Sequence, residues 1–330
     1  MDNGFWDNLP DPFYGLAPME DVTDVAFRQM FARYGRYEEG DQMRGPDVMW
    51  TEFTSADGLV KGGWKRLKHQ LKYQENERPI VAQLFSAHPG RMRQAAAICY
   101  QLGFDGVDIN MCCPSETVVG NDCGSALIKT PKLAQKLIKA AREGAGGLPV
   151  SVKTRTGFDE HRIKTWISTL LETHIAALSL HARTRKQMSK VPADWSTVEQ
   201  TREIRDQMNK DTLIIGNGDV ESLTEAKNRA GETGVEGIMV GRGAFGNPWF
   251  FNLDITRAKL PKKKRLSVMV EHAKTFDELL PDQHFAIMRK HFKAYTKGLP
   301  HANDLRNNLM QTADSAEVKE VVMNYLHGLK

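Results

Sequence analysis

The sequence predicts an α/β protein, a (β/α)8 barrel followed by a small C-terminal helical bundle. Short apolar runs rich in Val, Ile and Leu alternate with amphipathic segments between residues 13 and 240. Strand-then-helix units repeated in this way are typical of barrels whose parallel strands are buried on both faces. An open doubly wound sheet is the competing fold. It is disfavoured because no Gly-x-Gly-x-x-Gly turn opens a helix behind a predicted strand.

Eight apolar runs are predicted to be strands, because most are too short for helices. They cover residues 13–19, 48–53, 80–85, 106–111, 150–154, 176–181, 213–216 and 237–240. Helices are expected between them at residues 23–34, 91–102, 131–145, 162–172, 197–209 and 223–230. The charged, glycine-containing stretch 34–47 is predicted to be an extended loop.

Beyond Trp249 the apolar periodicity is helical and no further strand is expected. Helices are predicted at residues 266–280, 282–297, 302–312 and 315–327, with proline-containing breaks before the second and third. We therefore divide the chain into a barrel domain of residues 1–255 and a helical domain of residues 256–330.

Composition indicates in which cellular compartment the protein works and which kinds of partner it lacks. No apolar run approaches the roughly 20 residues of a membrane-spanning helix, and residues 1–6 lack the features of a secretory signal. Four cysteines (Cys99, Cys112, Cys113 and Cys123) are too few for a disulfide scaffold of this size. We expect a cytoplasmic, monomeric protein with neither a membrane partner nor a bound metal.

The charge is unevenly distributed along the chain. Residues 256–330 contain 14 Lys and Arg against 8 Asp and Glu, whereas the remainder contains 31 against 33. A basic helical domain on a nearly neutral barrel suggests a polyanionic partner, although a solvated helical face would have the same composition. Within the predicted helix 282–297, Lys290, Lys293 and Lys297 have the spacing of one helix face.

Polar residues and glycines stand at most predicted strand ends, where a barrel forms its active site. In chain order they include Pro18, Met19, Gln83, Asn110, Cys113, Lys153, Arg155, His181, Arg183, Arg185, Asn217, Gly218, Asp219, Gly241 and Arg242. This number of polar strand ends predicts a ligand site.

The last two of these loops, residues 216–219 and 241–243, are predicted to bind a phosphate. Their glycines allow backbone N–H groups to face one anion, and Arg242 supplies a countercharge. The glycines could instead serve only to form tight turns.

Three polar side chains suit a flavin ring. Lys153 offers a fixed cation for the N1–C2=O edge of a reduced ring, and Gln83 can both donate and accept hydrogen bonds. His181 could reach a ring carbonyl or a phosphate, or pack in the core. The Cys113 thiol could act as a nucleophile, a metal ligand, a redox partner or a proton donor.

Motifs along the whole chain resemble those of the tRNA-dihydrouridine synthases, flavoenzymes that reduce specific uridines in tRNA. The matching segments, in order, include Ala17-Pro18-Met19, Thr51-Glu52, Gln83-Leu84-Phe85, Asp108-Ile109-Asn110-Met111, Cys113-Pro114, Val152-Lys153-Thr154-Arg155, His181-Ala182-Arg183-Thr184, Asn217-Gly218-Asp219, Gly241-Arg242-Gly243 and Arg289-Lys290-His291. One residue departs from the pattern, since Cys112 stands where the family usually has glycine.

The resemblance implies roles for individual residues. It implies FMN contacts at Pro18, Met19, Gln83, Lys153 and His181, and phosphate contacts at Asn217, Gly218, Asp219, Gly241 and Arg242. Asn110 would face the target uracil, Cys113 would be the general acid, and Arg183 and Arg185 would hold substrate or its phosphates.

The implied reaction reduces uracil to 5,6-dihydrouracil, with NADPH as the reductant. A hydride would pass from FMN N5 to uracil C6, and a neutral thiol with an ordinary pKa near 8.5 would protonate C5. Because a barrel mouth cannot reach a stacked base, the nucleotide would be extruded into the pocket, with the helical domain on the RNA backbone.

Two other functions remain open at this point. A dihydroorotate or dihydropyrimidine dehydrogenase, acting on a free base, would share the flavin and the Asn and Cys residues but not the basic helical domain. A non-redox RNA-binding protein that keeps the barrel as a scaffold would have no need of Cys113, Lys153 and His181.

Overall fold

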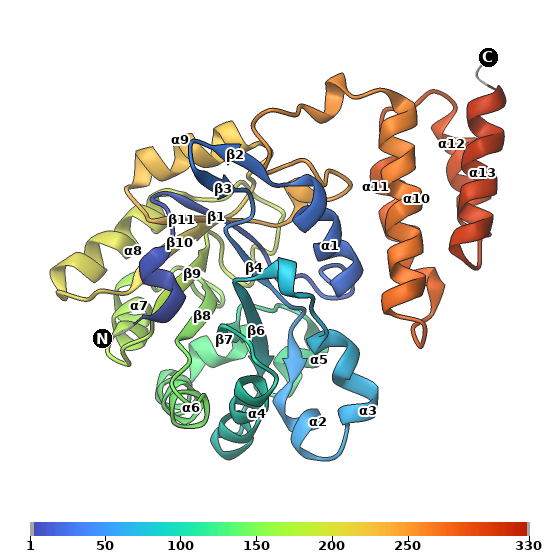
Figure 1. Cartoon of the computed structure of the whole chain (residues 1–330). Helices are drawn as coiled ribbons and strands as arrows, with labels where there is room; N and C mark the ends of the chain where they lie inside the picture. The colour runs from blue at the N-terminus through green and yellow to red at the C-terminus, as the bar shows by residue number, and fades with distance from the viewer. Residues whose placement is uncertain (1–2, 329–330) are drawn as a thin grey trace.

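The structure, a computed structural model, describes residues 3–328, with the backbone alone for Gln42. Its main sheet has parallel strands in the order β4-β1-β11-β10-β9-β8-β7-β6-β5, and β4 also pairs with β6. That pairing closes the sheet into a barrel (Figure 1). The strands of the closed barrel are β1 (Phe13–Leu16), β4 (Val48–Trp50), β6 (Ile80–Phe85), β7 (Gly106–Met111), β8 (Val150–Arg155), β9 (Ala177–His181), β10 (Leu213–Asn217) and β11 (Gly237–Val240). The predicted (β/α)8 barrel is confirmed.

Helices surround the barrel and match the six that the sequence predicts, with shifted ends. They are α1 (Val25–Tyr34), α4 (Pro89–Gln101), α6 (Pro131–Gly144), α7 (Ile163–Leu171), α8 (Ser196–Gln207) and α9 (Leu223–Thr233). Local chemistry sets several starts: the Asp24 carboxylate accepts from Phe27 N at α1, and α4 and α6 begin with proline. A short strand, β5 (Thr54–Ser55), leads into α2 (Ala56–Val60), α3 (Trp64–Leu67) and η2 (Lys68–Leu71).

Large side chains fill the N-terminal end of the barrel interior. Trp6, Phe13 and Trp50 belong to one buried cluster there. Two strand glycines make room for them, because a Cβ at Gly237 would lie 2.3 Å from the Phe13 ring and one at Gly15 would lie 2.6 Å from the Trp50 ring. The interior is therefore packed at this end, and polar side chains concentrate at the other.

The prediction of an extended loop at residues 34–47 was wrong. The chain forms an antiparallel hairpin there, with β2 (Tyr37–Glu39) paired to β3 (Gln42–Arg44). Gly40 adopts φ 62° at the turn, and the Arg44 guanidinium donates to Pro12 O at 3.1 Å. The sequence did not reveal these strands because each has only three residues and half of the six residues are charged.

One segment has the Gly-x-Gly-x-x-Gly spacing of a dinucleotide-binding motif, with glycines at 241, 243 and 246 after strand β11. After β11, however, the chain forms only the 3-10 turn η5 (Arg242–Ala244), and no α-helix follows directly. The arrangement that places a pyrophosphate at a helix start is therefore not formed here.

The C-terminal part is helical, as predicted, and stands beside α1 (Figure 1). It contains η6 (Arg257–Lys259), α10 (Lys262–Leu279), η7 (Phe285–Met288), α11 (Arg289–Tyr295), α12 (Ala302–Leu309) and α13 (Ser315–Gly328). The single helix predicted at 282–297 was wrong, because η7 precedes α11 and Lys297 lies beyond its end. Lys290 is not free on that face either, since its Nζ donates to Asp21 O at 2.6 Å.

The helical part shares its hydrophobic core with the barrel. Val25, Ala26 and Met30 of α1 and Trp249 pack in the same buried cluster as residues of α10 to α13. The Phe27 ring also lies 5.3 Å from the ring of His291. The two parts of the chain are therefore packed together through α1.

Candidate active site

A cavity of about 1230 Å³ opens at the C-terminal ends of the barrel strands. All but one of the residues predicted for the site line it, including Pro18, Met19, Gln83, Asn110, Cys113, Lys153, His181, Arg183, Asn217, Gly218, Asp219, Gly241 and Arg242. The exception is Arg185, whose guanidinium lies 5.3 Å from the centre of the Phe158 ring. The sequence thus identified one continuous site.

Lys153 on β8 brings a buried cation to the cavity wall. Only 6% of the residue is exposed, and its Nζ lies 3.2 Å from Asn217 Oδ1 and 3.5 Å from Cys112 Sγ. An ammonium has three donors, so one N–H remains for a ligand.

A buried hydrogen-bond network fixes Gln83. Its Nε2 donates to Asp108 Oδ2 at 2.6 Å, and its Oε1 accepts from Asn110 Nδ2 at 3.0 Å. Ser151 Oγ donates to the other Asp108 oxygen at 2.6 Å, and burial raises the pKa of Asp108 to about 6. The network sets the orientation of the Gln83 amide and leaves it one N–H and one lone pair for a ligand.

Asn110 shapes the turn that carries the two adjacent thiols. Its Oδ1 accepts from Cys112 N at 3.0 Å and from Cys113 N at 2.9 Å. Ser125 donates to Cys113 O through both its backbone N and its Oγ, at 3.1 and 2.9 Å. The Cys113 backbone is therefore held on both sides.

The pKa values of the two thiols are shifted in opposite directions. Burial raises the pKa of Cys113 to about 11. Burial alone would also raise the pKa of Cys112, but the charges of Lys153 and Arg155 outweigh it and lower that pKa. Neighbouring groups with divergent pKa values are a feature of acid–base sites.

The loops after β10 and β11 form the other end of the cavity and pack against each other. A Cβ at Gly243 would lie 2.1 Å from Val220 O, and one at Gly218 would lie 2.7 Å from Ala193 Cβ. Gly218 also adopts φ 145°. Gly243 therefore permits a close approach of the two loop backbones, and Gly218 a close approach to Ala193. Backbone without side chains also suits an anion.

Asp219 organises two arginines at this end. Its carboxylate accepts from Arg183 Nη2 and, at 2.9 Å, from Arg242 Nη2. Burial acts to raise its pKa, but the hydrogen bond and charge of Arg183 outweigh this and the pKa is lowered. The carboxylate thus positions two arginines, and only the backbone of Asp219 could donate to an anion.

His181 at the end of β9 is neutral. Burial and then the charges of Arg155, Lys153 and Arg183 lower its pKa well below the usual range. Its Nε2 lies 3.3 Å from Arg183 Nη1, which can only donate, so we assign the ring proton to Nδ1. His181 is therefore a neutral donor.

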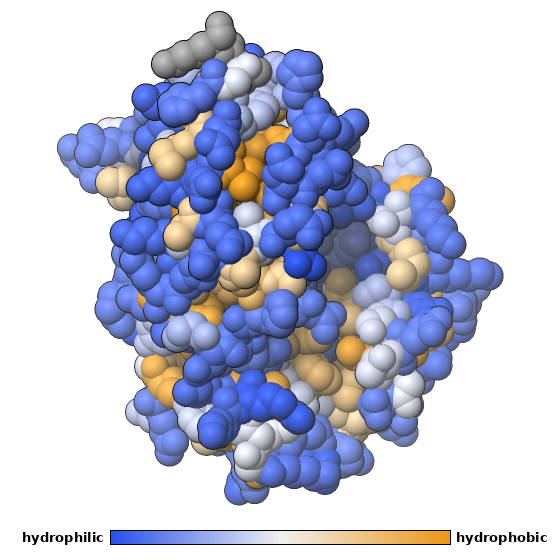
Figure 2. Space-filling view, turned by 90° about the vertical axis from the view of Figure 1, so that its right-hand side faces the viewer, coloured by the Kyte–Doolittle hydropathy of each residue, from blue (hydrophilic) through white to orange (hydrophobic). Residues whose placement is uncertain are grey.

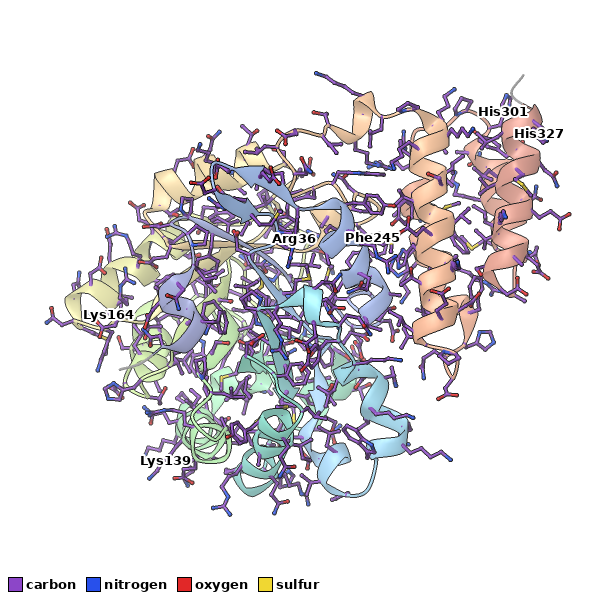
Figure 3. All side chains as sticks on the ribbon, viewed as in Figure 1. Arg36, Lys139, Lys164, Phe245, His301 and His327 are labelled. Carbon is purple, nitrogen blue, oxygen red and sulfur yellow. The ribbon has the colours of Figure 1, made fainter. Side chains whose placement is uncertain are left out.

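Other residues that the sequence did not assign to the site also line the cavity, among them Phe245 in the loop after β11 and Arg257, Arg265 and Lys297 of the helical part. Phe245 lies between the barrel and the helical part (Figure 3) and stacks on His291 at 5.1 Å. Arg265 Nη2 donates to Lys297 O at 2.8 Å. For the three cations, the sequence signal was the excess of Lys and Arg over Asp and Glu in residues 256–330.

The search for other kinds of site covers residues 3–328. Among them no group of three or more His, Cys, Asp or Glu side chains is placed to hold a metal ion. No helix in this part of the chain has the length and apolar character needed to cross a membrane.

Solved structures share the fold at low sequence identity. A histamine dehydrogenase from Rhizobium sp. 4-9 aligns with a TM-score of 0.51 and 11% identity, over 80% of this chain and 49% of that one. A 2-naphthoyl-CoA reductase aligns with a TM-score of 0.54 and 9% identity, over 73% of this chain and 49% of that one. These likenesses concern the barrel fold alone.

Closer relatives cover the full chain. It is 39% identical to the probable tRNA-dihydrouridine synthase 2 of Bacillus subtilis (strain 168), over 100% of both chains. It is 37% identical to a probable tRNA-dihydrouridine synthase of Staphylococcus aureus (strain COL), over 98% of this chain and 95% of the relative. The family model described as dihydrouridine synthase matches residues 15–328. With a barrel, a polar cavity and full-length relatives in agreement, the chain belongs to the dihydrouridine synthase family of enzymes.

Proposed function

We propose that this chain reduces specific uridines in tRNA to 5,6-dihydrouridine, with FMN as cofactor and NADPH as reductant, as a monomer in the cytoplasm. One observation carries the proposal within the family. A single cavity holds a buried cation, Lys153, and a neutral thiol, Cys113. A flavin site needs the first, and protonation of C5 needs the second.

The residues present fit FMN. The remaining N–H of Lys153, the oriented amide of Gln83 and neutral His181 would bind the ring system. Asn217, Arg242 and the backbone of Gly218, Asp219 and Gly241 would bind the phosphate, with Asp219 holding Arg183 and Arg242 in place. When bound, FMN supplies the hydride that is added to uracil C6.

The protein supplies the proton through Cys113. Because its pKa is raised to about 11, the thiol stays protonated at neutral pH and is available to C5. The turn fixed by Asn110 and Ser125 holds the thiol in one place. General acid catalysis of this kind contributes roughly 10²–10⁴-fold.

The target base has to leave the RNA stack to enter the cavity. Lys297 and Arg265 line the cavity, and as cations they would meet the RNA backbone around an extruded nucleotide. The face of the molecule that carries the helical part is mostly hydrophilic (Figure 2). We propose that RNA lies across this side.

A basic segment of the barrel extends the proposed RNA surface. Lys65, Arg66 and Lys68 of α3 and η2 are exposed, and the adjacent Trp64 is 41% exposed. With Asp282 and Gln283 of the helical part, the three basic residues line a hollow of about 440 Å³. Cations beside an exposed aromatic ring suit a nucleic acid.

The proposal is tested with purified protein in two steps. A flavin absorption band near 450 nm (an approximate property of the cofactor) is expected in the protein or after FMN is added. Unmodified tRNA with NADPH should then yield dihydrouridine, whereas free uracil and dihydroorotate should not react. Turnover of a free base without tRNA would instead support the dehydrogenase function, and failure to bind FMN would contradict the proposal.

A further inference from the structure

Cys112 lies beside the cation that is proposed to meet the flavin. Its Sγ is 3.5 Å from Lys153 Nζ, and the residue lines the cavity although it is only 7% exposed. The Arg155 guanidinium adjoins the same residue, since its Nε donates to Cys112 O at 2.8 Å. Two cations thus surround one small side chain.

Lys153 has no carboxylate partner among residues 3–328. Asp219 is bound to Arg183 and Arg242. Asp108 is hydrogen-bonded to Gln83 and Ser151, and its charge interacts with Lys153 without a direct ion pair. The remaining polar contact of Lys153, Asn217, is a neutral amide. A buried ammonium requires a compensating charge, and Cys112 is the group in contact that can supply it.

We propose that Cys112 and Lys153 form a buried thiolate–ammonium pair that sets the charge which the cavity presents to the flavin. This rests on the proposed use of FMN. The pair is neutral overall, whereas Lys153 alone would bring a full positive charge to the ring. A nearby positive charge stabilises the anionic reduced ring and so raises the reduction potential of the flavin. With the charge of Lys153 compensated by Cys112, the potential should be lower than with Lys153 alone.

The pair also acts on the neighbouring acid. Burial is the main cause of the raised pKa of Cys113, and the charge of Cys112 adds to it. The thiolate therefore helps burial to keep the Cys113 thiol protonated. Cys112 is thus a positioning residue that acts on the flavin through Lys153 and on the general acid Cys113. Removing its charge should free Lys153 and make Cys113 more acidic.

The first test needs no cofactor. The apoprotein is titrated while the ultraviolet absorbance of thiolates is followed, in the unsubstituted protein and in Cys112→Ser, Cys112→Ala and Lys153→Ala. We expect one thiolate at neutral pH that is lost in all three variants. Cys99→Ala is the matched control, because burial raises the pKa of that thiol to about 12 and it should contribute nothing at neutral pH. Absence of a thiolate from the unsubstituted protein at pH 8 would refute the pair.

The second test measures the midpoint potential of bound FMN. Cys112→Ser and Cys112→Ala should both shift it to more positive values, because both remove the charge, while serine keeps the size of the side chain. A potential unchanged in Cys112→Ser but shifted in Cys112→Ala would mean that Cys112 acts through volume, and the proposal would fail. If FMN does not bind, the proposed function fails, and the thiolate titration still decides the existence of the pair.

Discussion

At the scale of single residues, two adjacent thiols of the cavity differ in acidity, since the pKa of Cys113 is raised and that of Cys112 is lowered. Burial raises the pKa of Cys113 to about 11, so its thiol is a weaker acid than a cysteine thiol in water. In a general acid this means that the proton stays on sulfur until a strong base, such as a developing carbanion, is present. The thiol that the sequence singled out lines the cavity, but the ordinary pKa expected for it was wrong, because its burial could not be read from the motif.

The role of Cys113 is tested by Cys113→Ala. We expect dihydrouridine formation to fall by roughly 10²–10⁴-fold. FMN retention should stay unchanged, because alanine lacks only the thiol that serves as the proton source. Turnover assays and flavin spectra measure the two effects. Cys123→Ala is the control, since Cys123 packs beside Cys113 but does not line the cavity. Full turnover in Cys113→Ala would remove this thiol from the mechanism.

The pH dependence gives an independent check on the same thiol. If protonated Cys113 is required and its pKa is about 11, turnover on the alkaline side of the pH profile should persist to about pH 10 and fall only above it. A thiol with the ordinary pKa near 8.5 would lose turnover from about pH 8. Initial rates measured in buffers of constant ionic strength between pH 7 and 11 distinguish the two.

Lys153 and Arg242 should differ in their effects. Lys153→Ala removes the buried cation of the ring site, so it should weaken FMN retention and slow flavin reduction by NADPH even at saturating FMN. Arg242, whose side chain is 65% exposed at the phosphate end, should affect retention alone when replaced by alanine. Stopped-flow reduction at several FMN concentrations separates the two. Equal losses at saturating FMN would show that one of the residues is misplaced.

At the scale of elements, the strand ends explain why the site was predictable. In a closed barrel, inward-facing polar residues at the C-terminal ends of β6 to β10 converge regardless of how the surrounding helices are packed. Contacts from distant segments were not predictable. Arg265 and Lys297 reach the cavity because the helical part packs on α1, and no local pattern in the sequence encodes that docking.

The start of α1 combines two buried carboxyl groups. Asp24 caps the helix, and burial raises its pKa to about 6. Burial, followed by the nearby charge of Asp24, raises the pKa of Glu52 after β4 to about 8, from a usual 4.5. Glu52 therefore holds a proton in the folded protein over a pH range in which the unfolded chain has released it.

This linkage predicts a pH-dependent effect of Glu52→Gln. The favourable contribution of protonated Glu52 is fully present below about pH 4.5 and is lost as pH rises through about 8. Glutamine imitates the protonated form, so the variant should match the unsubstituted protein at pH 5 and exceed its stability at pH 9. Since one pKa unit is about 1.4 kcal/mol, the shift of the Glu52 pKa from 4.5 to about 8 corresponds to a gain of up to about 5 kcal/mol.

Thermal unfolding at pH 5, 7 and 9 measures this effect. Glu38→Gln, on the exposed β2–β3 hairpin, provides a matched charge change outside the core and should leave the pH profile unaltered. A stability difference for Glu52→Gln that is the same at every pH would contradict the assignment of a buried proton to Glu52.

At the scale of the whole molecule, the barrel and the helical part form one packed body with the cavity between them. The net positive charge of residues 256–330 is complemented by the cations of α3 and η2 on the barrel. RNA binding is therefore expected to depend on both parts of the chain, and not on the helical part alone as the charge distribution in the sequence suggested.

The barrel contribution is tested by combining Lys65→Ala, Arg66→Ala and Lys68→Ala. Each lost phosphate contact should reduce the slope of log affinity against log salt by about 0.7 to 0.9, and affinity at low salt should fall. Lys132, Lys136 and Lys139 of α6 are exposed, and Lys139 points away from the helical part (Figure 3), so their triple alanine variant is the control. Equal tRNA affinity and slope in both variants would exclude α3 and η2 from the interface.

The core that α1 shares with the helical bundle limits how the protein can be recombined. A chimera that received residues 256–328 from a relative would set foreign helices against the resident Val25, Ala26 and Met30. The bundle is thus not a portable specificity module, and an exchange of RNA preference between relatives should succeed only when α1 is transferred with it. Over evolutionary time, a drift in target position would have to be matched by compensating changes on this barrel helix.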